Sequence, residues 1–170
     1  MNVAIANLQR TRKINRRVLK KIVNALLVEL EVENAEISIC LVAAPEMTRL
    51  NETFLRHAGS TDVITFDYHI DGRAGRPLPA GGAHGVSHRA IHGEVLVCVD
   101  EAVGQARKFG TSWQSEIVRY IVHGALHLTG HDDRRPIARR NMKRVENHLV
   151  RQLSRRFSLA QLSRPARLSA

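Results

Sequence analysis

The chain has 170 residues and a mass of 19.0 kDa, 44% of its residues are hydrophobic, and its formal net charge is +10. A chain of this length forms one domain and buries enough surface to fold without staples, and its two cysteines, Cys40 and Cys98, lie in apolar runs, which excludes a disulfide scaffold. The absence of a signal-peptide pattern and of any run of about 18 uncharged apolar residues predicts a cytoplasmic protein without membrane attachment.

The first part of the chain carries signals for three strands and two helices. Residues 2–8 alternate as in a short strand, and residues 14–30 place apolar side chains at helical spacing. The β-branched run AEISICLVA at residues 35–43 predicts a second strand. Pro45 then begins a short helix that ends near residue 55, and TDVITFDY at residues 61–68 predicts a third strand.

A long irregular segment separates these elements from the next strand. Residues 69–91 contain five of the 11 glycines and two of the five prolines and show no periodicity, which predicts a loop or an insertion. A strand is expected at residues 93–99. Asp100 is expected to cap a following helix, which Gly110 ends because glycine readily adopts a positive φ.

Two further helices complete the domain. Thr111 and Gln114 form a predicted capping box before an apolar helix, and Pro136 begins the last helix. About four strands and five helices predict a single α+β or α/β domain over residues 1–155. Beyond it, residues 156–170 lack regular apolar spacing and are expected to form a basic, flexible tail.

The positive charge is concentrated near the C-terminal end of the chain. Residues 1–133 contain 15 basic and 15 acidic residues, whereas residues 134–170 contain 11 basic residues and one acid, Glu146. A cationic segment beside a neutral body is typical of proteins that bind nucleic acid. The alternatives are binding to an anionic membrane and a basic tail that is simply solvated.

The strongest chemical signal is VHGALHLTGHDDR at residues 122–134. His123 and His127 are four residues apart on a predicted helix, about 40° apart around its axis, so both imidazoles can bind one cation. Gly130 can end the helix and let the chain fold back. One of residues 131–133 would then supply a third ligand, leaving the fourth tetrahedral position to water.

Other interpretations of the histidines are weaker. Two helical histidines can simply pack in a core, and His84, His88 and His92 are interpreted as loop residues rather than as a second metal site. The spacing of the helical pair also occurs in zinc peptidases, in which a glutamate follows the first histidine as general base. Gly124 stands there in this chain, which favours hydrolysis of a phosphodiester over hydrolysis of a peptide.

Three separated blocks of the chain follow the pattern of one known family. The blocks are LNETFLRHAGSTDVITF at residues 50–66, HGEVLVCVD at residues 92–100 and HGALHLTGHDD at residues 123–133. They resemble the segments LNxxFRxxxxxTDVLSF, LGDIVIS and HGxLHLxGYDH of the YbeY family, metal-dependent endoribonucleases of ribosomal RNA maturation. The resemblance covers residues 1–155 and implies a small α+β domain with about four strands and one Zn²⁺ ion per chain.

The resemblance also implies roles for individual residues. His123 and His127 take the first two metal-ligand positions, and Arg56 takes the role of the active-site arginine that holds a phosphate oxygen. Asp133 stands where the family has its third histidine ligand, and a carboxylate is an oxygen donor that zinc accepts. His131, which stands where the family has a tyrosine, is the rival third ligand and a candidate general base.

The combined expectation is a single-strand-specific, zinc-dependent endoribonuclease whose partners are ribosomal RNA and ribosomal subunits. Thr61 and Asp62 are expected to position the cleft. The first alternative is a ribosome- or RNA-binding factor with a structural zinc, which a closed site of four protein ligands would support. The second alternative is a zinc peptidase.

Overall fold

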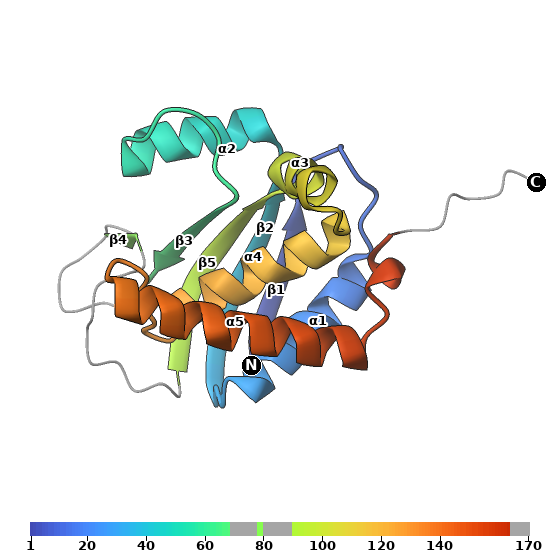
Figure 1. The fold of residues 1–170 in the computed structure, drawn as a ribbon, viewed down its shortest axis with the longest axis vertical. Helices are drawn as coiled ribbons and strands as arrows, with labels where there is room; N and C mark the ends of the chain where they lie inside the picture. Colours follow the sequence, from blue (N-terminus) through green and yellow to red (C-terminus); the bar gives the residue numbers. More distant parts are fainter. Residues whose placement is uncertain (69–77, 80–89, 164–170) are drawn as a thin grey trace, which may run out of the picture.

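A mixed sheet forms the centre of the computed structural model, which describes residues 1–68, 78–79 and 90–163 (Figure 1). The strand order is β1-β2-β5-β3-β4. Strands β1 (Asn2–Asn7), β2 (Asn34–Val42) and β5 (Ala90–Cys98) are parallel to one another. Strand β3 (Val63–Asp67) runs antiparallel to β5, and the two-residue strand β4 (Leu78–Pro79) pairs with β3.

Helices cover both faces of this sheet. They are α1 (Arg16–Glu29), α2 (Ala44–Leu50) with a π-helical turn η1 (Asn51–Leu55), α3 (Val99–Phe109), α4 (Trp113–Leu128), α5 (Pro136–Arg156) and the 3-10 turn η2 (Leu159–Leu162). Helices α1 and α4 lie against one face, and α5 lies outside them at the front of the view (Figure 1). Among the described residues, four main strands and five α-helices confirm the expected α+β fold.

The apolar side chains divide into two cores, one on each face of the sheet. The larger core contains Leu19, Ile39 and Leu126, which are essentially inaccessible to solvent, and joins α1, α4 and α5 to the sheet. The smaller core lies under α2 and contains Met47 and Phe66. Burial on both faces is the usual consequence of covering parallel strands with helices.

Both cysteines are free and buried in the smaller core, as expected. Burial, together with a hydrogen bond to the Glu94 carboxylate, raises the pKa of the Cys40 thiol to about 11. A thiol with such a pKa stays protonated and unreactive at neutral pH. In the part of the chain that the structure describes, every helix is too short or too polar to span a bilayer.

The predicted cap of α3 is wrong. The helix begins at Val99, so Asp100 lies in its first turn rather than before it. One carboxylate oxygen of Asp100 accepts a hydrogen bond from the Thr11 hydroxyl and the other accepts from the Ala44 backbone N–H, each at 2.6 Å. Asp100 therefore joins the chain after β1 to the start of α2. Gly110 ends the helix with φ of 66°, as predicted.

The capping box predicted for α4 is also wrong. Ser112 is the N-cap residue, and its hydroxyl accepts from the Ser115 N–H at 3.1 Å. The Thr111 hydroxyl instead donates to the Glu116 carboxylate. Gln114 donates to the Ser163 hydroxyl, a contact between residues far apart in sequence that local spacing cannot reveal.

The segment interpreted as a long loop contains some strand structure. β5 begins at Ala90, three residues earlier than expected, because it pairs with β2 from there onward. Two residues of the segment form β4. His84 and His88 lie outside the described residues, and His92 lies on β5, 3.8 Å from a Glu36 carboxylate oxygen.

The segment after α5 does not begin as a free tail. Leu162 is fully buried, and its carbonyl accepts a hydrogen bond from the Asn15 N–H at 2.8 Å. Phe157 and Leu159 pack against the larger core. The expectation of a flexible segment from residue 156 is therefore wrong for residues 157–163, because three well-spaced apolar side chains suffice to anchor them.

Candidate metal centre

Helix α4 places the two predicted histidines on one face, beside the point where the chain turns back. Gly130 has φ of 87° and ends the helical path, as the sequence predicts. The His131 N–H then donates to the Leu126 carbonyl at 2.9 Å, which folds the chain against the end of α4. This return brings Asp133 next to both histidines.

The three side chains form a compact group of ligand atoms. The Nε2 atoms of His123 and His127 are 3.0 Å apart, and Oδ2 of Asp133 is 3.9 Å from each. A triangle with these sides has a centre about 2.1 Å from every corner, which is the usual length of zinc–nitrogen and zinc–oxygen bonds. Two imidazoles and one carboxylate are also a donor set that zinc accepts.

The tautomer of His127 is set by the returning chain. Its Nδ1 lies 3.1 Å from the backbone carbonyl of His131, and a carbonyl can only accept, so Nδ1 carries the hydrogen. The lone pair of Nε2 therefore faces Asp133 and His123. Burial lowers the pKa of His127, and the neighbouring His123 lowers it further, which favours the neutral ring that a metal requires.

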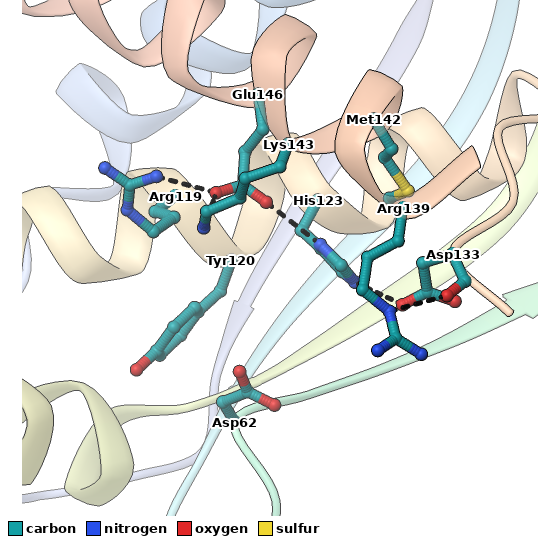
Figure 2. Close-up of a pocket in the computed structure, with 9 residues that line it drawn as sticks. All are labelled: Asp62, Arg119, Tyr120, His123, Asp133, Arg139, Met142, Lys143 and Glu146. Atoms are coloured by element: carbon teal, nitrogen blue, oxygen red, sulfur yellow. Dashed lines mark hydrogen bonds and ion pairs between the residues drawn. The ribbon is translucent and has the colours of Figure 1, made fainter. Parts of the chain in front are cut away.

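His123 is held by a buried carboxylate from α5 (Figure 2). Its Nδ1 lies 3.0 Å from Oε2 of Glu146, whose residue is 3% exposed. Burial alone raises the pKa of Glu146, but hydrogen bonds from His123, Lys143 and Arg119 outweigh it and hold the pKa at about 2. An ionised carboxylate accepts only, so Nδ1 of His123 also carries the hydrogen and Nε2 is available as a ligand.

Glu146 is the functional residue that sequence reasoning missed, although a signal was present. It is the single acid among 11 basic residues in the last 37 positions, and it shares the buried side of α5 with Met142, Leu149 and Leu153. A carboxylate on an apolar helix face needs buried partners of opposite charge. Its oxygen Oε1 accepts from Arg119 and from Lys143, each at 2.6 Å.

A cavity of about 240 Å³ lies beside the histidine pair (Figure 2). It is lined by Asp62, Arg119, Tyr120, His123, Asp133, Arg139, Met142, Lys143 and Glu146. The walls come from α4, α5, the turn between them and the chain before β3, and three of the lining side chains are cations. Asp62 lies where the sequence predicted a cleft residue, whereas Thr61 is not among the lining residues.

Gly124 has a packing role that explains why no glutamate follows His123. A Cβ atom at this position would lie 2.6 Å from a methyl group of Val95 and 2.9 Å from the Thr65 hydroxyl. The backbone of α4 thus touches the sheet at this point. A carboxylate here would be buried in the contact with the sheet and could not act as a base. The glutamate base that follows the first histidine in zinc peptidases therefore has no equivalent at this position.

The two residues predicted to be catalytic lie apart from the ligand group. His131 supplies its backbone carbonyl to His127, while its own Nδ1 lies 3.2 Å from the Leu126 carbonyl and 3.3 Å from the Thr129 hydroxyl. Arg56 is exposed at the end of η1 with a left-handed φ of 57° and is not among the residues that line the cavity.

Arg56 also departs from the family pattern quoted above. In LNxxFRxxxxxTDVLSF the arginine directly follows the aromatic residue, whereas Leu55 follows Phe54 here and Arg56 comes one position later. The irregular π-helical turn Asn51–Leu55 immediately precedes it. The catalytic role of Arg56 therefore remains a prediction.

Comparison with solved structures identifies the fold. A solution structure of a protein from Thermotoga maritima superposes with a TM-score of 0.64 and covers 99% of both chains. Its sequence is 20% identical, so this likeness concerns the fold alone.

Comparison of sequences identifies the family. Relatives named endoribonuclease YbeY include one from Salinibacter ruber, 38% identical over 67% of this chain and 68% of its own length. Another, from Geobacter metallireducens, is 31% identical over 79% of this chain and 83% of its own length. A third, from Myxococcus xanthus, is 35% identical over 79% of this chain, but the match spans just 42% of that relative. A family model described as endoribonuclease YbeY matches residues 4–154, and the chain therefore belongs to the YbeY family.

Proposed function

We propose that the chain is a metal-dependent endoribonuclease that cuts single-stranded ribosomal RNA, with one zinc ion held by His123, His127 and Asp133. The observation that carries this proposal is the triangle of three ligand atoms, in which both imidazoles have their Nδ1 hydrogens already engaged. The names of the curated relatives support the same reaction class. Ribosomal subunits are the corresponding proposed partners in the cytoplasm.

Some residues of the site would hold the metal, and others would attract the RNA. A zinc ion in this group would supply Lewis-acid activation of a water molecule and of the phosphate. Glu146 and the His131 carbonyl keep the two imidazoles in the required tautomers. Arg139 and Lys143 line the cavity and present positive charge to the phosphodiester, and Arg56 is proposed to hold a non-bridging oxygen.

A simple reconstitution tests this proposal. Zinc-loaded protein is incubated with precursor and mature ribosomal RNA, with a chelator, and with the chelator followed by excess zinc. We expect internal cuts that disappear with the chelator and return with zinc, and the matched His123→Ala variant should cut under none of these conditions. Cleavage that persists in the chelator and in the variant would disprove a metal-dependent nuclease.

The RNA-binding factor with a structural zinc makes a different prediction. A structural zinc site normally has four protein ligands, whereas the group among the described residues has three. The large apolar core does not depend on the group, so mild chelation should leave the far-ultraviolet circular dichroism intact. Unfolding on chelation would favour the structural zinc.

A further inference from the structure

The excess positive charge of the chain is carried mainly by a folded helix. Of the 11 basic residues in positions 134–170, nine lie between Arg134 and Arg156, on α5 or immediately before it. Helix α5 packs against α4 and α1 and lies at the front of the molecule in Figure 1. The cationic segment is therefore a fixed surface with a defined direction.

Four arginines share the outer side of α5. Arg140, Arg144, Arg151 and Arg155 are all exposed, and we call them the outer stripe. At 100° per residue they fall within about 60° of one another around the helix axis, roughly opposite the buried side. At 1.5 Å per residue the stripe is about 22 Å long.

The charge of the outer stripe is not neutralised by the protein. Within the described part of the chain, no carboxylate forms an ion pair with any of the four arginines. Arg144 donates to the side-chain oxygen of Asn141, and Arg151 donates to the Asn147 carbonyl. Both acceptors are uncharged, so the stripe keeps its four positive charges.

The outer stripe leads toward the metal group. Lys143 lies on the flank of α5 between the stripe and its buried side, and Arg139 lies in the first turn of α5 on the side that faces Glu146. Both line the cavity that His123 and Asp133 also line. Nε of Arg139 donates to the Asp133 carbonyl at 2.9 Å, so its guanidinium is fixed beside the ligand group (Figure 2). Cations thus extend from the outer surface of α5 to the candidate ligands.

We propose that the outer stripe binds the phosphate backbone of RNA and directs the strand past Arg139 and Lys143 into the cavity. An extended row of unpaired arginines matches a polyanion with repeated charges. An anionic membrane matches less well, because a helix that binds a membrane surface exposes an apolar side. The apolar side of α5 is buried, and among its large apolar residues Ile137 alone is strongly exposed.

A charge-matched pair of variants tests this proposal, which rests on the proposed function for the identity of the ligand. The stripe variant combines Arg140→Gln, Arg144→Gln, Arg151→Gln and Arg155→Gln. The control combines Arg16→Gln, Arg17→Gln, Lys20→Gln and Lys21→Gln, which are exposed on α1 and remove the same charge. Glutamine has nearly the helix propensity of arginine and lysine, so both variants should fold.

The measurement is the affinity of the zinc-loaded proteins for a fluorescein-labelled single-stranded RNA at several salt concentrations, with strand integrity checked on a gel. Four lost phosphate contacts should make the slope of log affinity against log salt shallower by about 2.8. Between 50 and 200 mM salt the parent should therefore lose about 50-fold more affinity than the stripe variant. The control should keep the parental slope.

Several outcomes would overturn the proposal. An unchanged slope in the stripe variant would do so, and so would an equal change in the control, which would show a general effect of net charge. Reduced binding to phosphatidylserine vesicles with unchanged binding to RNA would assign the stripe to a membrane.

The proposed function can fail separately. Cleavage of a trinucleotide, which is too short to span the stripe, should be the same in the parent and the stripe variant. If the parent cuts no RNA but the slope still changes in the stripe variant alone, the nuclease proposal fails and the stripe remains an RNA-binding surface.

Discussion

The α4–α5 pair and the end of η1 differ in how firmly the protein holds a candidate functional side chain. In the α4–α5 pair and its connecting turn, Glu146 and the His131 carbonyl fix the orientation of both imidazoles through the protein's own contacts. At the end of η1, Arg56 is exposed and follows an irregular turn. The comparison shows that folding alone brings the three candidate ligands together, whereas Arg56 would have to be ordered by a substrate to act in cleavage.

The largest effect on RNA cleavage is expected from a change in the histidine pair of α4. His123→Ala removes one ligand, and loss of the Lewis acid should reduce cleavage by at least about 1000-fold, or about 4 kcal/mol. The zinc-free variant should still unfold cooperatively, with a thermal midpoint somewhat below that of the zinc-free parent, because Glu146 loses one hydrogen bond but keeps Arg119 and Lys143. Single-turnover cleavage with excess enzyme measures the loss of rate. Retained cleavage would show that the group is not the catalytic centre.

Residues 157–163 test whether the segment after α5 belongs to the packed fold. Leu162→Ala should reduce the free energy of unfolding by about 2–5 kcal/mol, because it creates a cavity in the larger core. Leu8→Ala is the matched control, since Leu8 is 70% exposed. Urea unfolding measures both variants. Equal, small effects would restore the interpretation of this segment as a flexible tail.

Substitutions of Arg56 test whether this exposed arginine takes part in cleavage. Arg56→Lys should lower single-turnover cleavage about 10- to 100-fold, or about 1.4–2.7 kcal/mol, because an ammonium cannot bind two oxygens as a guanidinium does. Arg56→Gly should lose more activity yet fold at least as stably, because glycine tolerates the left-handed φ of 57° that costs other residues about 1 kcal/mol. Full activity in Arg56→Gly would transfer the role to a cation that lines the cavity, Arg139.

Glu146 tests whether fixing the imidazole matters. Glu146→Gln keeps the shape of the side chain but weakens the partner of His123, and affinity for zinc should fall about 10- to 100-fold. Glu116→Gln is the matched control, because Glu116 is also a buried glutamate, lies on α4 and accepts a hydrogen bond from the Thr111 hydroxyl. Competition with a chromogenic chelator measures the affinity. Equal affinities in both variants would show that Glu146 stabilises the fold alone.

Local sequence patterns predicted the parts of the site that one element determines. The spacing of His123 and His127 depends on helix geometry, and the turn at Gly130 depends on a backbone conformation that glycine prefers. The pairing of Glu146 with His123 depends instead on how α4 and α5 pack. Side chains 23 positions apart meet there, and no local period records such a contact.

The wrong predictions for Asp100 and for the segment that contains Leu162 have one physical origin. Asp100 has the residue type of a helix cap, but tertiary hydrogen bonds to Thr11 and Ala44 use its carboxylate. Leu162 lies in a basic segment, but it is buried against elements from the other end of the chain. In both cases a contact distant in sequence outweighs a local preference.

The most direct test of the central claim is the zinc content of two neighbouring variants at a fixed low concentration of free zinc. Asp133→Asn and His131→Asn differ by two positions, and the parent should bind one ion per chain. We predict that Asp133→Asn loses the ion, whereas His131→Asn retains it, because residue 131 contributes to the group through its backbone carbonyl. Loss of zinc in His131→Asn with full occupancy in Asp133→Asn would contradict the assigned metal centre.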